Sequence, residues 1–193
     1  YRIVRQAPNG HCFFLSLIAG LEKVNKHYSV NELREKLVNK TTEEVFNHFK
    51  TLVNKRSQGK PIAYLIGKKE FWKYEFYVNK NVLIPRPDTE LIVERVLKIY
   101  SKNSRIQVLD IGTGSGCILL SILKERANFY GTGIKKKKKS INISKFNAKK
   151  LKLMNRVKFY NSDVDNFKIG KYDLIVSNPP YIELLNLKYL ERE

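Results

Sequence analysis

A glycine-rich segment in the second half of the chain has the residue types of a cofactor-binding loop. It comprises Val108, Leu109, Asp110, Ile111, Gly112, Thr113, Gly114, Ser115 and Gly116. The apolar start predicts a buried strand, and the glycines predict a tight turn that opens a helix. In a doubly wound sheet this turn meets the ligand, and glycines let the backbone come close to it. We expect the cofactor to be bound by Asp110, Gly112, Thr113, Gly114, Ser115 and Gly116.

The spacing of the glycines favours S-adenosylmethionine over NAD. The pattern is G-x-G-x-G, which differs from the phosphate-binding loop and from the dinucleotide fingerprint. Asp110, at the end of the strand, suits the ammonium group of a cofactor that carries an amino acid. The alternative is a tight turn that binds nothing.

One expected contact to such a cofactor is missing. Folds of this kind place a carboxylate about 20 residues after the loop, where it accepts hydrogen bonds from the ribose hydroxyls. Counting from Gly112 leads to Gly133. A charge-assisted hydrogen bond is worth about 1.5–3 kcal/mol, so we expect its loss to weaken cofactor binding about 10-fold or more.

A second segment with chemical capacity follows the apolar residues 174–176 and comprises Ser177, Asn178, Pro179, Pro180 and Tyr181. The Asn178 side-chain oxygen and the Pro179 carbonyl can accept both N–H bonds of a planar amide, and Tyr181 can stack on it. These groups would aim the amide nitrogen at a sulfonium methyl by orientation and electrostatics, without a separate base. We expect Asn178, Pro179 and Tyr181 to be catalytic, Pro180 to bind substrate with them, and Asn178 also to lie near the cofactor. The alternative is a turn that ends a strand.

The pattern of apolar residues indicates which elements position these segments. It predicts strands at 108–109, 129–130, 157–160 and 172–176, and helices at 88–100, 114–124 and 140–152. Asp88 is expected to cap the first helix, with Leu91, Ile92, Val96 and Leu97 facing inward. The alternation predicts an α/β fold with a parallel sheet, at whose carboxyl edge both segments would meet.

The residues before this pattern divide into two parts. Capping boxes at Ser29 with Glu32 and at Thr41 with Glu44 predict helix starts. The second helix ends near Ser57 and carries an apolar stripe that we interpret as core, made of Val45, Phe46, Phe49, Leu52 and Val53. Residues rich in β-branched and aromatic types then predict a hairpin. The predicted domains are a helical module at 1–60, a β-hairpin linker at 61–84 and an α/β domain at 85–193.

Residues 57–183 resemble the protein-(glutamine-N5) methyltransferases that modify the Gly-Gly-Gln glutamine of peptide chain release factors. The matching stretches are residues 59–67, 71–76, 82–90, 110–116 and 177–182. Residues 84–90 are the most discriminating, because Asn-Pro-Pro-Tyr also occurs in DNA adenine methyltransferases. The resemblance implies a class I, Rossmann-like S-adenosylmethionine-dependent methyltransferase, with the cofactor at 112–116 and the substrate glutamine at 178–181.

The chain also departs from the family pattern. Gly133 replaces the acidic ribose ligand, and Val164 stands where an aromatic residue often flanks the adenine. The chain stops at Glu193, before three further strands of the family's domain, so we expect a C-terminally incomplete sheet with an exposed apolar edge and impaired stability or activity. The alternatives to a glutamine methyltransferase are a DNA adenine N6-methyltransferase and an inactive remnant.

Residues 8–17 resemble the nucleophile loop of ovarian-tumour-type cysteine proteases, where a cysteine opens a helix. Cys12 would be the nucleophile, but Asn9 replaces the usual acidic residue, and the remaining histidines, His27 and His48, are local. A gene-fusion remnant and a plain helical cap are the alternatives.

Composition excludes several classes of protein. The chain has 193 residues, a net charge of +19 and 42% hydrophobic residues, which excludes full disorder. No apolar run approaches the ~18 residues of a membrane span, and two cysteines favour a reduced, cytoplasmic location. We interpret the lysines at 135–139 as a solvated stretch rather than a binding site. We expect a monomer that holds no metal, acts on a release factor and does not require nucleic acid.

Overall fold

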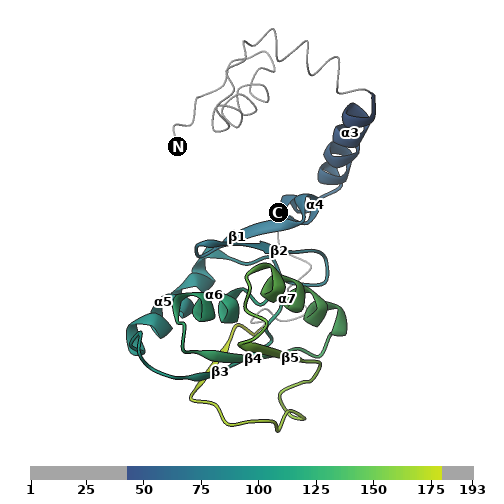
Figure 1. The fold of residues 1–193 in the computed structure, drawn as a ribbon. Helices are drawn as coiled ribbons and strands as arrows, with labels where there is room; N and C mark the ends of the chain where they lie inside the picture. The colour runs from purple at the N-terminus through teal and green to yellow at the C-terminus, as the bar shows by residue number, and fades with distance from the viewer. Residues whose placement is uncertain (1–42, 180–193) are drawn as a thin grey trace, which may run out of the picture. The chain divides into compact units, whose positions relative to one another are not determined.

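The computed structural model describes residues 43–179 and divides the chain into two compact units, Tyr1–Asn54 and Lys55–Glu193 (Figure 1). Helix α3 (Glu43–Ser57) ends at the predicted residue. Phe46, Phe49 and Val53 on this helix are about half exposed, so the prediction that its apolar stripe is core is wrong for these three side chains. The segment around Cys12, the box at Ser29 and the cap residue Thr41 lie outside the described residues.

The second unit is built on a four-stranded parallel sheet, which confirms the predicted fold class. Its strands are β3 (Gln107–Ile111), β4 (Tyr130–Ile134), β5 (Val157–Tyr160) and β6 (Leu174–Ser177). Their order across the sheet is β5-β4-β3-β6, and all three pairings are parallel. From β3 the chain runs outward on one side through β4 and β5 and then returns to place β6 on the other side of β3. The carboxyl end of β3 therefore lies beside the carboxyl ends of both β4 and β6.

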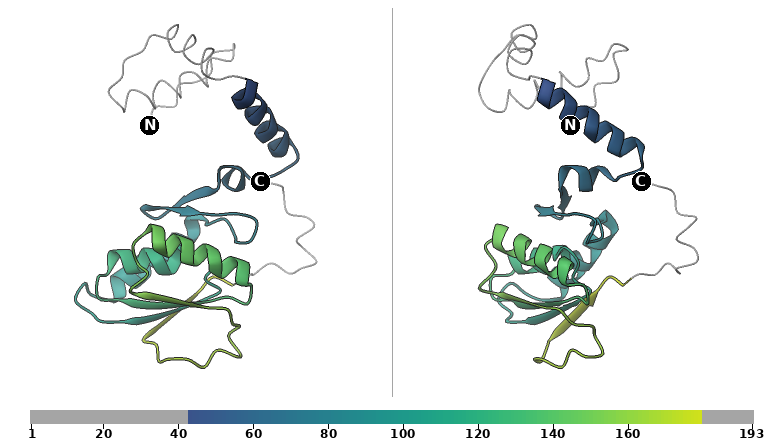
Figure 2. Two further views of the ribbon diagram at one scale, coloured as in Figure 1. Left: turned by 45° about the vertical axis from the view of Figure 1, so that its right-hand side comes forward. Right: turned by 90° about the vertical axis from the view of Figure 1, so that its right-hand side faces the viewer.

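Three helices lie against one face of this sheet: α5 (Glu90–Ile99), α6 (Cys117–Glu125) and α7 (Lys138–Lys150) (Figure 2). The core between them centres on α6, whose side chains are buried from Cys117 to Leu123. Helix α6 begins three residues later than predicted, because Gly114 and Gly116 have left-handed backbone angles (φ 57° and 83°) that a helix cannot contain. Within residues 43–179, no helix combines the length and the apolar character needed to cross a membrane.

The start of α5 differs from the sequence prediction. A short 3-10 turn, η1 (Pro87–Thr89), precedes the helix, and the N-cap position falls on Thr89 rather than on Asp88. The inward face also differs, because Val93 is fully buried while Leu91 is 60% exposed. Val96 is buried, and Ile92 and Leu97 pack against the core as predicted, so only Leu91 departs from the expected face.

The predicted hairpin is present but shorter than the aromatic-rich region. Strands β1 (Lys68–Phe71) and β2 (Tyr74–Tyr77) pair in antiparallel register. Residues Ile62–Ile66 form the one-turn helix α4 instead of a strand, between Pro61 at its N-cap and Gly67 at φ 73°. The β-branched residues there were misleading because the flanking proline and glycine decide the local backbone. The predicted domain limits at residues 60 and 84 stay a prediction.

Glu125, the last residue of α6, fixes the hairpin to the sheet domain. Its carboxylate accepts hydrogen bonds from Trp72 Nε1 and Tyr74 Oη, both at 3.0 Å, and pairs with Lys73 Nζ at 3.0 Å. Burial alone would raise the pKa of Glu125, but these three donors outweigh it and lower the pKa. Trp72 holds a left-handed backbone (φ 59°), which is uncommon for a bulky residue. Glu125 therefore supports a strained two-residue turn.

Replacing Glu125 with alanine leaves the indole N–H and the tyrosine hydroxyl without their acceptor. We expect Glu125→Ala to lower the free energy of unfolding by about 1–3 kcal/mol, the usual cost of losing a charged hydrogen-bond partner. Urea unfolding measures this. Glu94→Ala, which removes only the i,i+4 pair with Lys98, is the control and should cost less than about 0.5 kcal/mol. Equal effects of the two variants would contradict the role of Glu125.

Candidate active site

The glycine loop and the Asn-Pro segment begin at adjacent strand ends. In the β3–β6 ladder, Ile111 is paired with Ser177, and the Ser177 hydroxyl donates a 2.9 Å hydrogen bond to the Ile111 carbonyl. Gly112 follows the last residue of β3, and Asn178 follows the last residue of β6. The prediction that both segments lie at one edge of the sheet is therefore confirmed.

The glycine loop is held from below by β4. The Ile134 carbonyl accepts hydrogen bonds from both Gly112 N (2.9 Å) and Thr113 N (3.1 Å), and Gly116 N donates to Thr113 O (2.7 Å). Gly112, Gly114 and Gly116 have φ values of 83°, 57° and 83°. Side chains rarely adopt these angles, so the loop needs glycine at these three positions whether or not a ligand is present.

Helix α7 holds the loop from the side, through residues that the sequence analysis missed. Ser144 Oγ and Ser140 Oγ donate to the Gly114 carbonyl at 2.8 Å and 3.2 Å. Asn147 Nδ2 donates to the Ser115 carbonyl at 2.9 Å, and all three side chains are fully buried. Their spacing of four and three residues is the one signal that would have revealed them, as a polar stripe on one helix face.

Asn147 also joins this stripe to the hairpin. Its Oδ1 accepts a hydrogen bond from Tyr77 N at 2.8 Å, and its Nδ2 donates to Tyr77 O at 3.0 Å. The buried Asn147 amide thus bonds both backbone groups of Tyr77, the last residue of β2, and the Ser115 carbonyl of the glycine loop. The hairpin and the loop are therefore fixed to each other through a single side chain.

Asp110 lies beneath the loop, with its side chain almost fully buried at 1% exposure. Burial raises the pKa of Asp110 to about 6, although the Thr113 hydroxyl, the Leu119 backbone and the Lys135 charge each act to lower it. Asp110 Oδ2 and Thr113 Oγ1 are buried and lack a hydrogen-bond partner of good geometry within the described residues. The Thr113 hydroxyl can donate to the Asp110 carboxylate, and the remaining lone pairs of the two side chains suit a ligand that carries N–H or O–H groups.

The residue expected to contact the ribose is not at position 133. Gly133 lies inside β4, paired with Asp110, and a Cβ atom there would come within 2.7 Å of the Phe159 ring and 2.9 Å of the Thr113 hydroxyl. No carboxylate fits, so the prediction that position 133 should hold one is wrong. The first residue after β4 is Lys135, whose Nζ lies 4.0 Å from where a Cβ on Gly112 would stand. Lys135 therefore places a cation close to the glycine loop, two residues after the position at which a carboxylate was expected.

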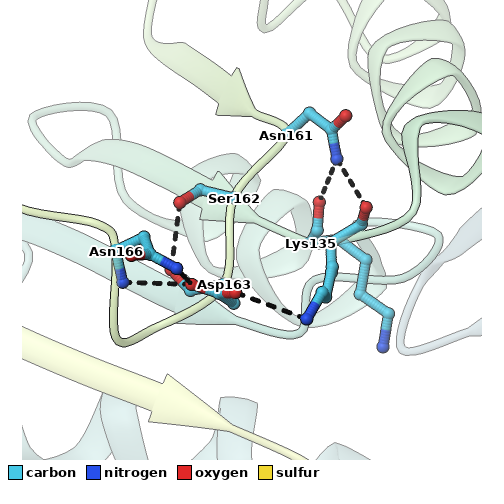
Figure 3. Close-up of polar contacts among 6 residues, drawn as sticks. Lys135, Asn161, Ser162, Asp163 and Asn166 are labelled. Atoms are coloured by element: carbon cyan, nitrogen blue, oxygen red, sulfur yellow. Dashed lines mark hydrogen bonds and ion pairs between the residues drawn. The ribbon is translucent and has the colours of Figure 1, made fainter.

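The backbone at Lys135 is tied down on both sides. Lys135 N donates to Tyr160 O at 3.2 Å, and Asn161 Nδ2 donates to the carbonyls of Lys135 (3.0 Å) and Lys136 (2.7 Å) (Figure 3). Lys136 also pairs with Asp163 at 3.6 Å. The interpretation of the lysine run as solvated is therefore wrong for the half-buried Lys135, whereas Lys136 to Lys139 are exposed as expected.

Asn178 connects the second segment to the start of α5. Its Nδ2 donates to Thr89 Oγ1 at 3.2 Å, and its side chain is half-buried, while Pro179 is exposed. Pro180 and Tyr181 lie outside the described residues. The structure thus brings Asn178 and Pro179 to the sheet edge that carries residues 110–116. The roles of all these residues in binding and catalysis stay predictions.

Comparison with known proteins gives a consistent family. Residues 87–190 match the model of the methyltransferase small domain. The chain is 40% identical to the release factor glutamine methyltransferase of Buchnera aphidicola subsp. Acyrthosiphon pisum over 152 residues, which is 79% of this chain and 54% of that protein. It is 39% identical to the enzyme of the same name from Bacillus subtilis over 147 residues, covering 72% of this chain and 50% of that protein. The chain spans about half the length of the curated relatives it matches.

The buried carboxyl predicts an unusual dependence of stability on pH. Because the pKa of Asp110 is raised from 3.8 to about 6, the folded state binds this proton more tightly than the unfolded state. Its contribution to stability is complete below pH 3.8 and is lost as the pH rises through 6. Relative to Asp110→Asn, the free energy of unfolding should fall by roughly 2–3 kcal/mol from pH 4 to pH 7.

Urea unfolding of the wild type and of Asp110→Asn across this range measures the difference. The same substitution at the exposed Asp165 is the control, and its difference from the wild type should change little with pH. A pH-independent difference for Asp110→Asn would show that the Asp110 carboxyl is not held in an unfavourable buried environment.

Proposed function

The chain belongs to the methyltransferase small-domain family, and we propose that it transfers the methyl group of S-adenosylmethionine to a glutamine side-chain amide in a peptide chain release factor. One observation carries this proposal: the pairing of Ile111 with Ser177 puts the glycine loop and Asn178 at one edge of the sheet. The printed names of the relatives give the substrate class. A monomer located in the cytoplasm stays a prediction.

The residues present suit the binding of this cofactor. The backbone of Gly112–Gly116 would face it, and the buried side chains of Asp110 and Thr113 offer oxygen lone pairs to its N–H and O–H donors. When bound, S-adenosylmethionine supplies an electrophilic methyl group on a positively charged sulfur. The remaining work of the protein is to bring a weak nucleophile to that methyl group in the right orientation.

The Asn-Pro segment has the groups for that work. The lone pair of an amide nitrogen is conjugated with its carbonyl, so the nitrogen is a poor nucleophile. The Asn178 Oδ1 atom and the Pro179 carbonyl would accept its two N–H bonds and so draw negative charge onto the nitrogen. Two consecutive prolines, Pro179 and Pro180, restrict the backbone that presents the carbonyl. These acceptors would orient the amide without a separate base.

A DNA adenine N6-methyltransferase is the second candidate, because an adenine amino group is also a planar NH2 and the net charge of +19 suits nucleic acid. A direct test incubates the chain with methyl-labelled S-adenosylmethionine and either a release factor or a DNA duplex. We expect label on the release factor alone, and none after its Gly-Gly-Gln glutamine is changed to alanine. Label on DNA would favour the second candidate, and label on neither would favour an inactive remnant.

The same assay tests Asn178. Asn178→Ala should lower the methylation rate by about 10²–10³-fold, the usual cost of removing a preorganised polar group that acts on the transition state. Calorimetry should show S-adenosylhomocysteine binding within a few-fold of the wild type. A variant that keeps full activity would remove Asn178 from the proposed chemistry.

Lys135 predicts that the cofactor affinity of this chain can be raised by one substitution. Lys135→Asp removes a cation beside the loop and adds an acceptor for ribose hydroxyls. We expect S-adenosylhomocysteine to bind about 10-fold more tightly, corresponding to ~1.4 kcal/mol. The control is Lys138→Asp, which makes the same charge change at an exposed position at the start of α7. Equal gains in both variants would mean that only net charge matters.

A further inference from the structure

We propose that Thr89 is a positioning residue that sets the orientation of the Asn178 amide, and that this explains part of the segment at 84–90. The inference rests on the proposed function only for its consequence in catalysis. The contact itself is structural: Asn178 Nδ2 donates to Thr89 Oγ1 at 3.2 Å, between residues 89 positions apart in the chain.

The Thr89 hydroxyl does not cap helix α5, although it stands at the N-cap position. Thr89 occupies the N-cap position of α5, where a threonine side chain usually accepts a hydrogen bond from the first helical turn. Here Thr89 has a helical backbone (φ −71°, ψ −16°) and its side chain makes no capping bond. Thr89 is also the last residue of the 3-10 turn Pro87–Thr89, which accounts for its helical backbone. Its hydroxyl accepts from Asn178 instead.

The position of Thr89 is fixed by its neighbours. Thr89 N donates to Arg86 O at 3.1 Å, and the next residue, Glu90, accepts a 2.7 Å hydrogen bond from Trp72 N through its carboxylate. Val93, one turn further along α5, is fully buried. The hairpin turn, the start of α5 and Asn178 are thus joined in sequence by hydrogen bonds through Glu90 and Thr89.

In this arrangement the nitrogen of the Asn178 amide contacts Thr89, so that the amide oxygen is the end left for the substrate. An amide that donates through nitrogen keeps its oxygen as an acceptor, and no donor within residues 43–179 is bonded to Asn178 Oδ1. An acceptor is the group that a substrate N–H bond requires. With the Thr89 hydroxyl as the acceptor, rotation of the amide by 180° would give up this hydrogen bond, present the NH2 group to the substrate and oppose binding.

Two variants of the full chain separate positioning from packing. Thr89→Val keeps the shape and removes the oxygen, whereas Thr89→Ser keeps the oxygen and removes a methyl group. The matched control is Thr51→Val on α3, whose hydroxyl bonds the Asn47 carbonyl of its own helix and no other group within the described residues. The thermal unfolding midpoints of all three variants should lie close to that of the wild type.

The first measurement does not depend on activity. The side-chain NH2 signals of Asn178 in a ¹H–¹⁵N correlation spectrum are identified by their absence in Asn178→Asp. We expect these signals to shift in Thr89→Val and to stay in place in Thr89→Ser and Thr51→Val. Unchanged signals in Thr89→Val would overturn the proposal, even if the chain proves to have no methyltransferase activity.

The second measurement is methylation of a release factor. We expect Thr89→Val to lower kcat by about 10–100-fold, with KM for S-adenosylmethionine changed less than 2-fold, and Thr89→Ser to recover most of kcat. Full activity of Thr89→Val would overturn the positioning role while leaving the proposed function intact. Failure of the wild type to transfer a methyl group would reject the proposed function, and the NMR result would still decide whether Thr89 holds Asn178.

Discussion

The carbonyl of Ile134 is the atom on which the organisation of the site depends most. It accepts two N–H bonds from the glycine loop, at Gly112 and Thr113, and it belongs to the last residue of β4. The loop can therefore turn only where β3 and β4 end together, in the register that pairs Ile111 with Ile134. Because Ile111 is also paired with Ser177, the same level of the sheet fixes the start of the Asn-Pro segment. The candidate site therefore forms where β3, β4 and β6 end at the same height in the sheet.

The sequence was sufficient where one local rule decided the structure. Period and composition predicted the parallel sheet, the strand at Val157–Tyr160 and the end of α3 at Ser57. The sequence-based prediction failed where it relied on a residue count or on a residue propensity and the three-dimensional arrangement decided the outcome. Counting about 20 residues led to Gly133, but only the strand end shows that Lys135 follows β4. Aromatic content predicted a strand at Ile62–Ile66, where proline and glycine enclose a helical turn.

The polar support of the site was hidden for a different reason. Ser140, Ser144 and Asn147 lie in a helix rich in lysine, and their contacts are to loops and strands about 26 to 70 residues away. Their residue types alone suggest a solvated surface. Burial converts them into structural groups, since each hydrogen bond to a loop carbonyl replaces one that water would otherwise make. Long-range contacts of this kind need the fold first.

The charge beside the glycine loop differs from what the fold leads one to expect. A carboxylate after β4 would attract the sulfonium and accept from ribose hydroxyls, whereas Lys135 does neither. Its charge offsets only part of the burial that raises the pKa of Asp110. A cationic cofactor must then displace or tolerate the ammonium group. The backbone geometry of the glycine loop and the charge of the side chains beside it are therefore independent properties. This chain has the expected loop geometry, but it has a lysine where a carboxylate would favour the cofactor.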